Sequence, residues 1–254
     1  MCLIVFAKNY HPDYPFILIA NRDEFYERPT APAEFWESSA HLLAGRDLKA
    51  MGTWMGITKS GRFAALTNYR DLENINPEAK SRGHLCTDFL LDARSGVDFL
   101  KDVNSQSDQY NGFNLLVMNE DEMHHYSNYE HKINVVDPGV FGLSNALFDT
   151  PWPKVTLLKE RFKTLIDQEV SHDGLLQLLA DDKKAEDEHL PATGVSYEWE
   201  KALSSICIKT EQYGTCSSTV LTMDRSGLVK FTEKLYPVGQ RIESQNTFEF
   251  KLEK

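Results

Sequence analysis

The sequence has few cysteines, an excess of acidic over basic residues, and no long apolar run. Its 254 residues include only four cysteines, which are scattered and without CxxC spacing. A disulfide framework is therefore not indicated, and we expect reduced thiols in a cytoplasmic protein. Lys and Arg number 27 against 38 Asp and Glu, a net charge of −11, which argues against nucleic-acid binding. No apolar run approaches the roughly 20 residues of a membrane helix, so we expect no membrane insertion.

The sequence also lacks the common motifs of cofactor-dependent enzymes. It contains no GxGxxG, no GxxxxGK[ST] and no HExxH, which argues against nucleotide-loop and zincin sites. No linker rich in Gly, Ser or Pro divides the chain, so we predict a single domain over residues 1–254. Hydrophobic residues make up 41% and charged residues 26%, which is the composition of a globular protein.

Short apolar runs separated by turns predict strands on both sides of a helical middle. The predicted strands are residues 3–7, 16–20, 53–58, 62–67, 113–118, 123–127, 132–137, 217–223, 228–235 and 247–252. The predicted helices are residues 153–168, 175–180 and 197–204. Pro153 suits the first turn of a helix, and Ser196 is a helix-capping residue. Hairpins in place of βαβ units predict an α+β fold.

Cys2 is the residue with the clearest chemical potential. A small residue after Met1 favours removal of that methionine, which would leave a thiol and a free α-amine on Cys2. The amine, with a reference pKa of about 7.7–8.0, can then serve as the base for its own side chain. The alternative is that Cys2, beside Leu3, is a small buried hydrophobic residue.

Pairing of the first two strands brings polar residues to Cys2. A hairpin without a bulge sets Leu3 opposite Ala20 and Cys2 opposite Asn21, with Arg22 and Asp23 just beyond the strand end. In this arrangement Arg22 would lower the pKa of the thiol, and Asp23 would hold the α-ammonium. The alternative is a surface ion-pair cluster of Arg22, Asp23 and Glu24.

Several motifs, in order along nearly the whole chain, resemble the NRDE family, which is also called transport and Golgi organisation protein 2. They are MCLIVFA (1–7), ANRDEF (20–25), RPT (28–30), AGRD (44–47), GTWMG (52–56), LTNYR (66–70), GLSN (142–145), LPATG (190–194) and YGT (213–215). The layout of this family looks like that of the N-terminal-nucleophile hydrolases. The resemblance implies a four-layer αββα sandwich with two stacked, mainly antiparallel sheets and the nucleophile at the start of the first strand.

The same resemblance implies roles for individual residues. Cys2 would be the nucleophile, attended by Arg22 and Asp23, and Asn145 would be a donor of the oxyanion hole. Asn68 would be a second polar donor. The residues expected to contact substrate are Asn21, Glu24, Trp54, Tyr69 and Cys216. The sequence departs from the family at Cys216, where arginine is usual, and from the hydrolases in the direct adjacency of Arg22 and Asp23.

Two functions follow from the resemblance and stay open. One is an amidohydrolase or acyltransferase that acts on a linear amide C–N bond of an N-acyl small molecule, without a cofactor. The other is a carrier on the same fold, which would hold haem or an acyl conjugate and take part in haem trafficking. His124, His125 and His131 are possible ligands of a metal or haem iron, but solvated histidines are the expected alternative. We therefore predict no metal site. The sequence does not specify an oligomeric state.

Overall fold

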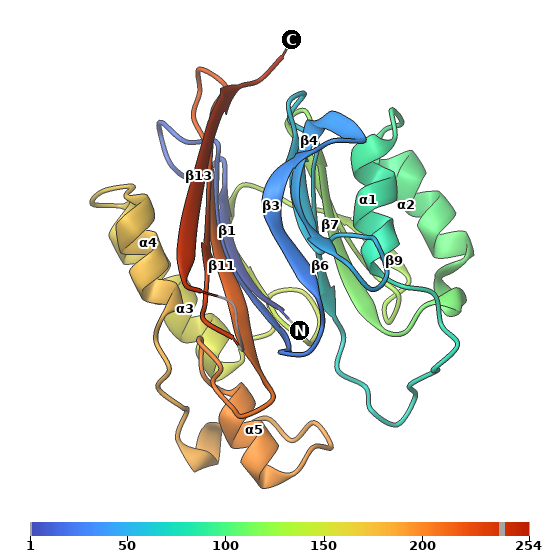
Figure 1. Ribbon diagram of the computed structural model, residues 1–254, viewed down its shortest axis with the longest axis vertical. Helices are drawn as coiled ribbons and strands as arrows, with labels where there is room; N and C mark the ends of the chain where they lie inside the picture. The colour runs from blue at the N-terminus through green and yellow to red at the C-terminus, as the bar shows by residue number, and fades with distance from the viewer. Residues whose placement is uncertain (1, 239–241, 254) are drawn as a thin grey trace. The chain divides into compact units, whose positions relative to one another are not determined.

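The structure, a computed structural model, describes residues 2–238 and 242–253. The chain divides into two compact units, each with one sheet and its own helices (Figure 1). Unit 1 is Met1–Glu27 together with Pro138–Phe250, and unit 2 is Arg28–Asp137 together with Lys251–Lys254. The single domain over residues 1–254 stays a prediction.

Unit 1 is built on a sheet with the strand order β10-β1-β2-β11-β12-β13. Its strands are β1 (Cys2–Lys8), β2 (Phe16–Phe25), β10 (Gly139–Leu143), β11 (Tyr213–Met223), β12 (Leu228–Leu235) and β13 (Ser244–Lys251). Its helices are α3 (Pro153–Ile166), α4 (His172–Leu179), α5 (Tyr197–Leu203) and the 3-10 helix η2 (Asp187–His189). β2 is central, because β1 and β11 pair with it on either side.

Helices α3 and α4 cover one face of this sheet (Figure 1). Odd-numbered residues of β1 and β2, such as Val5 and Ile19, pack against Phe162 of α3 and Leu175 of α4. α3 begins with a proline, and the side chain of Ser171 caps α4 by accepting from the backbone N–H of Gly174. Alternation along the strands therefore divides unit 1 into a helix-facing side and an opposite side.

Unit 2 is built on a sheet with the strand order β3-β4-β5-β6-β7-β8-β9. Its strands are β3 (Thr30–Trp36), β4 (Ser39–Asp47), β5 (Met55–Thr58), β6 (Phe63–Asn68), β7 (Phe113–Asn119), β8 (Glu122–Ser127) and β9 (Lys132–Val135). Its helices are α1 (Gly83–Leu91), α2 (Gly96–Ser105) and the 3-10 helix η1 (Ser107–Gln109). Each strand in this order follows its neighbour in the chain, as in a meander.

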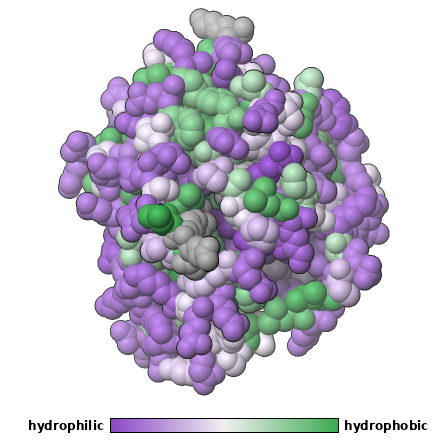
Figure 2. All heavy atoms as spheres, in the orientation of Figure 1, coloured by the Kyte–Doolittle hydropathy of each residue, from purple (hydrophilic) through white to green (hydrophobic). Residues whose placement is uncertain are grey.

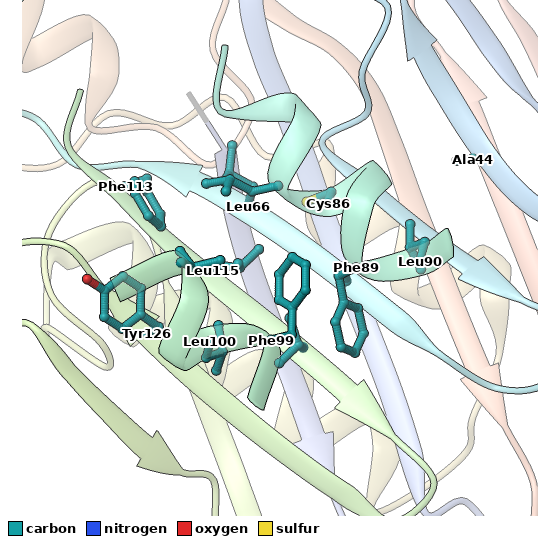
Figure 3. Close-up of a cluster of buried hydrophobic side chains, with 14 of the residues drawn as sticks. Ala44, Leu66, Cys86, Phe89, Leu90, Phe99, Leu100, Phe113, Leu115 and Tyr126 are labelled. Carbon is teal, nitrogen blue, oxygen red and sulfur yellow. The ribbon is translucent and has the colours of Figure 1, made fainter. Parts of the chain in front are cut away.

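The core of unit 2 lies between this sheet and helices α1 and α2 (Figure 3). Phe89 of α1 and Phe99 of α2 meet edge to face with ring centroids 5.2 Å apart, a favoured aromatic geometry. Leu100 and Leu115 are fully buried beside them. The hydroxyl of Tyr126, at the margin of the cluster, donates to Asn104 Oδ1 at 2.9 Å. The helix-facing side of this sheet is thus mainly an apolar core.

The predicted α+β class with two mainly antiparallel sheets is confirmed. The strand pairs that join β10, β1, β2, β11 and β12, and those that join β3 to β9, are antiparallel. Each sheet carries helices on one face, as each half of an αββα sandwich requires. The helix predicted at residues 153–168 and the capping role of Ser196 are confirmed as well.

Some elements of the structure have no counterpart among the sequence predictions. They are β3, β4, β10, α1 and α2. Pro32 lies within β3, which is at the edge of its sheet and shifts register between Ala31 and Glu34, where a proline is tolerated. α2 does have a sequence signal. The Ser95 side chain accepts from the Asp98 backbone N–H at 3.1 Å, and this serine and acid three residues apart form a capping pair.

The predicted register of the first hairpin is wrong by one residue. Lys8 extends β1 and pairs with Phe16, so Ile4 lies opposite Ala20 and Cys2 lies opposite Arg22. The loop between them is closed where the Asn9 backbone N–H donates to the Pro15 carbonyl at 2.8 Å. β2 also continues past Ala20 to Phe25, because β11 pairs with it there. A slip of one residue changes which side chains share a face, and here it moves Asn21 away from Cys2.

Hydrophilic residues dominate the face of the molecule shown in Figure 2, with hydrophobic residues in smaller groups between them. In the part of the chain that the structure describes, no helix has the length and apolar character that crossing a membrane requires.

Candidate functional site

Cys2 is the first residue of β1 and faces the side of the sheet away from the helices. Its exposed fraction is 9%, and its register partner is Arg22. Burial raises the pKa of the Cys2 thiol above its usual value, while the nearby guanidinium of Arg22 acts in the opposite direction. The thiol is therefore protonated at neutral pH unless a base takes its proton.

Arg22 is central to a row of side chains that crosses three strands. It lies opposite Cys2 on β1 and opposite Ser217 on β11, and side chains at such positions are direct neighbours. Arg22 is 7% exposed, and its Nη2 lies 4.0 Å from Glu24 Oε2. Glu24 also accepts from the backbone N–H of Phe25 at 3.0 Å. This places a buried cation beside the thiol, as predicted, but through a different register.

The other flank of Cys2 is formed by the residues that follow β10. Ser144 Oγ donates to the backbone carbonyl of Cys2 at 3.4 Å and contacts Asn145 Oδ1 at the same distance. Asn145 is 1% exposed. The pairing of Ile4 with Leu143 carries this segment alongside the start of β1. Ser144 beside Cys2 and Ser217 opposite Arg22 were not among the predicted site residues, although Ser144 belongs to the GLSN motif.

Asn21 and Asp23 lie on the helix-facing side, because they alternate with Arg22 along β2. The Asn21 amide donates to the carbonyls of Leu179 at 2.9 Å and Ile206 at 2.8 Å, and its oxygen accepts from Ser218. These bonds tie the end of α4 and the segment before β11 to the central strand. Asn21 thus has a clear role in the fold, and its contact with substrate stays a prediction.

Asp23 is a buried carboxylate with a hydroxyl partner. It is 1% exposed, and Thr215 Oγ1 donates to its Oδ1 at 2.7 Å. Burial raises the pKa of Asp23, while the ammonium of Lys154 on α3 opposes that shift. Lys154 is itself buried and donates to the Leu203 carbonyl at 2.9 Å.

Cys216 occupies a bulge between β11 and β2. The register of β11 against β2 shifts between Thr215 and Ser217, so Cys216 is the extra residue. Its thiol is buried and contacts the carbonyls of Glu24 at 3.7 Å and Gly214 at 3.5 Å. The structure thus brings Cys2, Arg22, Glu24 and Asn145 together, with Cys216 one strand away.

The other predicted site residues belong to unit 2. Asn68 is the last residue of β6 and pairs with Phe113. Tyr69 follows it and stacks on Tyr129 with ring centroids 3.8 Å apart. Trp54 is packed against Gly45, where an added Cβ would lie 2.4 Å from the indole, so a larger residue cannot replace that glycine without displacing the ring. The roles of Asn68, Tyr69 and Trp54 stay predictions.

The expectation of solvated histidines is wrong for two of the three. His124 and His125 are 4% and 0% exposed, and a Cβ added to Gly96, the first residue of α2, would lie 3.3 Å from His124 Nδ1. His125 Nε2 lies 3.2 Å from Asn114 Oδ1, and burial lowers the pKa of His125 to about 4. Asn114 in turn donates to Thr67 Oγ1 at 3.2 Å. Across residues 2–238 and 242–253, no three His, Cys, Asp or Glu side chains group as metal ligands would.

Comparison with known families identifies the chain. The family model described as "Transport and Golgi organisation 2" matches residues 1–237. The chain belongs to this family. The Transport and Golgi organization 2 homolog of Mus musculus is 35% identical over 277 residues, covering 100% of both chains. The Bos taurus homolog is 38% identical over 256 residues, covering 92% of each. The family resemblance seen in the sequence is therefore confirmed.

Two solved hydrolases resemble the chain more distantly. A Caenorhabditis elegans ortholog of N-acylethanolamine-hydrolyzing acid amidase matches with a TM-score of 0.42 and 9% identity, over 87% of this chain and 92% of its own. The C2A mutant of conjugated bile acid hydrolase from Clostridium perfringens matches with a TM-score of 0.49 and 9% identity, over 98% and 92%. With TM-scores below 0.5, neither resemblance determines the activity of this member of the Transport and Golgi organisation 2 family.

Proposed function

We propose that this protein is an N-terminal-cysteine amidohydrolase or acyltransferase that acts on a linear amide of an N-acyl small molecule. Removal of Met1 would expose the α-amine of Cys2, whose reference pKa of about 7.7–8.0 suits a base at neutral pH. The observation that supports this proposal best is the position of Cys2 between Arg22 and the Ser144–Asn145 segment. A nucleophile, a cation and an amide donor thus meet at the end of three adjacent strands.

The proposed reaction uses these groups in turn. The α-amine takes the thiol proton, and the Cys2 sulfur attacks the amide carbonyl carbon. The side-chain N–H groups of Asn145 and nearby backbone N–H groups stabilise the oxyanion. The C–N bond then breaks, and the amine leaves with the proton from the α-ammonium. Water, or another amine in the case of an acyltransferase, finally attacks the thioester and releases Cys2.

Burial makes the α-amine essential to this proposal. Because burial raises the pKa of the Cys2 thiol, little thiolate is present without an adjacent base. Arg22, in the register position opposite Cys2, stabilises the thiolate once it forms. We therefore expect turnover to rise as the pH increases through the pKa of the α-amine.

The first test is the mass of the purified native protein together with hydrolysis of simple N-acyl amides. We expect loss of Met1 and turnover that Cys2→Ser abolishes. Cys86→Ser is the matched control, because Cys86 is a buried thiol of unit 2 that contacts the Trp54 carbonyl. Retention of Met1, or equal turnover in Cys2→Ser, contradicts the mechanism.

Alkylation distinguishes an activated Cys2 from the other thiols. All four cysteines are buried and lie outside any disulfide, which is consistent with the proposed reducing, cytoplasmic location. If the freed amine activates Cys2, brief treatment with iodoacetamide should label it faster than Cys86, Cys207 or Cys216. Labelling of Cys2 at the same rate as the others argues against activation.

A carrier of haem or of an acyl conjugate is the second candidate function. The raised pKa of the buried thiol favours it, because a protonated Cys2 is a packed side chain and not a nucleophile. Haem binding that survives Cys2→Ser, without amide hydrolysis by the wild type, would support the carrier.

A further inference from the structure

A polar cavity of about 320 Å³ lies in unit 1 at the opposite end of the strands from Cys2. Thr222 of β11, which lines it, pairs with Ile17 near the start of β2, whereas Cys2 pairs with Arg22 near the end of β2. Thr222 lies two residues from Val220, which packs in the core under α3 and α4, so both side chains are on the same face of β11. The cavity therefore opens on the helix-facing side, where α4 begins over β11, β12 and β13.

A chain of hydrogen bonds forms one wall of this cavity and crosses three strands. His172, at the start of α4, has Nε2 3.0 Å from Thr222 Oγ1 and Nδ1 2.8 Å from Thr232 Oγ1. Thr232 Oγ1 lies 3.0 Å from Thr247 Oγ1 on β13. Thr247 is exposed, so the chain ends at a hydroxyl that a ligand can reach. Hydroxyl groups can both donate and accept, and this wall therefore matches a ligand with the same capacity.

The wall is electrically neutral. Burial and the ammonium of Lys230 lower the pKa of His172 to about 4, although Asp173 and Glu249 oppose this, so the imidazole is uncharged at physiological pH. Lys230 Nζ pairs with Glu249 Oε1 at 3.1 Å. The carboxylates of Glu169 and Asp173 also line the cavity. With one paired ammonium against carboxylates, the cavity does not favour an anion.

We propose that this cavity binds a neutral polyhydroxylated ligand, a mono- or disaccharide. The threonine hydroxyls and the amide of Gln245 supply both donors and acceptors to sugar hydroxyls, and the carboxylates of Glu169 and Asp173 supply acceptors. The ring of Tyr14, also in the lining, offers an apolar surface to the C–H face of a sugar. The volume lies at the lower end of the about 300–1,000 Å³ that small-molecule sites occupy. This site is independent of Cys2 chemistry.

Titration of the full-length protein with glucose and with maltose, followed by NMR, tests the proposal. The imidazole ¹⁵N signals of His172 report on the hydrogen-bonded wall, and we expect at least one of the two sugars to shift them saturably. Thr247→Val and Gln245→Leu should each weaken that binding by about fivefold or more, the usual effect of one neutral hydrogen bond. Both residues are exposed on an edge strand, so these variants should fold.

Matched controls keep the outcome clear. Thr164→Val on α3 and Gln177→Leu on α4 change exposed residues outside the cavity and should leave sugar affinity unchanged. Inorganic phosphate and glycine are the competing probes. Shifts of His172 with phosphate or glycine but not with either sugar overturn the proposal. Absence of any saturable shift, or equal affinity in Thr247→Val and the wild type, overturns it as well.

Discussion

The helix-facing sides of the two sheets differ in a way that bears on function. In unit 2, the side under α1 and α2 is a cluster of aliphatic and aromatic residues such as Phe89, Leu100 and Leu115. In unit 1, the side under α3 and α4 is apolar along the middle of the strands. At the end near Cys2, however, it becomes a buried polar group of Asn21, Asp23, Thr215 and Ser218. The side in unit 2 is mainly apolar, although buried Arg62 donates there to the Phe89 carbonyl. The side in unit 1 is a core that ends in a group of hydrogen-bonded side chains.

Neighbouring residues of the ANRDEF motif have different structural roles, because they lie on opposite faces of β2. Arg22 faces away from the helices and lies beside Cys2, whereas Asn21 and Asp23 face the helices. Asn21 fixes the end of α4 and the segment before β11, and Asp23 anchors Thr215. The proposed site is thus held in place by residues on the reverse side of the same strand, and the following predictions separate these tasks.

The largest effect should come from Asn21→Leu. The change leaves the carbonyls of Leu179 and Ile206 without their donor, and each unsatisfied buried group costs about 1–3 kcal/mol. We expect the free energy of unfolding to fall by about 2–6 kcal/mol in urea denaturation. Asn246→Leu, on the exposed edge strand β13, is the control and should change stability by less than about 0.5 kcal/mol. Similar small losses in both variants would mean that the polar end is dispensable for folding.

The apolar side provides the next test. Leu100→Ala removes a fully buried side chain from the core of unit 2, and such cavities cost about 2–5 kcal/mol. Leu91→Ala, at the exposed end of α1 with 48% exposure, is the matched control. Urea denaturation should show a loss below about 1 kcal/mol for the control. Equal effects at both positions would contradict the placement of this core.

Much of the fold was predictable because it rests on local patterns. The strand at 113–118 and the helix at 153–168 appear close to their predicted bounds, since each carries its own periodicity and turn signals. The strand character of residues 21–25 was not predictable, because this polar segment is held in the sheet by β11, about 190 residues further along the chain. The register of the first hairpin failed for a related reason, since Lys8 is buried and belongs to the strand.

The candidate site was predictable as a set of residues but not as a geometry. Motifs pointed to Cys2, Arg22 and Asn145, and the structure brings them to the end of three adjacent strands. Alternation along β2 places Asn21 and Asp23 on the opposite face from Arg22, and the register decides which of these residues lies beside Cys2. Ser217 lies opposite Arg22 because Cys216 forms a bulge in β11. This bulge has no sequence signature of its own.

A smaller effect is expected from Ser218→Ala. Its hydroxyl donates to Asn21 Oδ1 and lies 2.9 Å from the Tyr236 hydroxyl, so the loss should be about 1 kcal/mol, the usual value of one hydrogen bond. Ser244→Ala, at an exposed position of β13, is the control in the same urea denaturation experiment. A loss no greater than that of the control would mean that the Asn21 oxygen finds another donor.

The smallest effect concerns the pH dependence that Asp23 gives to stability. Burial raises the pKa of Asp23 in the folded state, against the opposing ammonium of Lys154, whereas the unfolded value is about 3.9. The folded state then holds the Asp23 proton more tightly than the unfolded state does. The stabilisation that this protonation contributes to the folded state is complete below about pH 3.9 and is lost as pH rises through the raised pKa. The wild type should therefore lose stability relative to Asp23→Asn over this window, with a constant difference above it.

Urea denaturation of both proteins at a series of pH values measures this difference, with Asp121→Asn at an exposed turn as the control. Lys154→Met should enlarge the effect, because it removes the cation that opposes the shift. A difference between wild type and Asp23→Asn that stays flat with pH would show that Asp23 is no harder to ionise in the fold than in the unfolded chain.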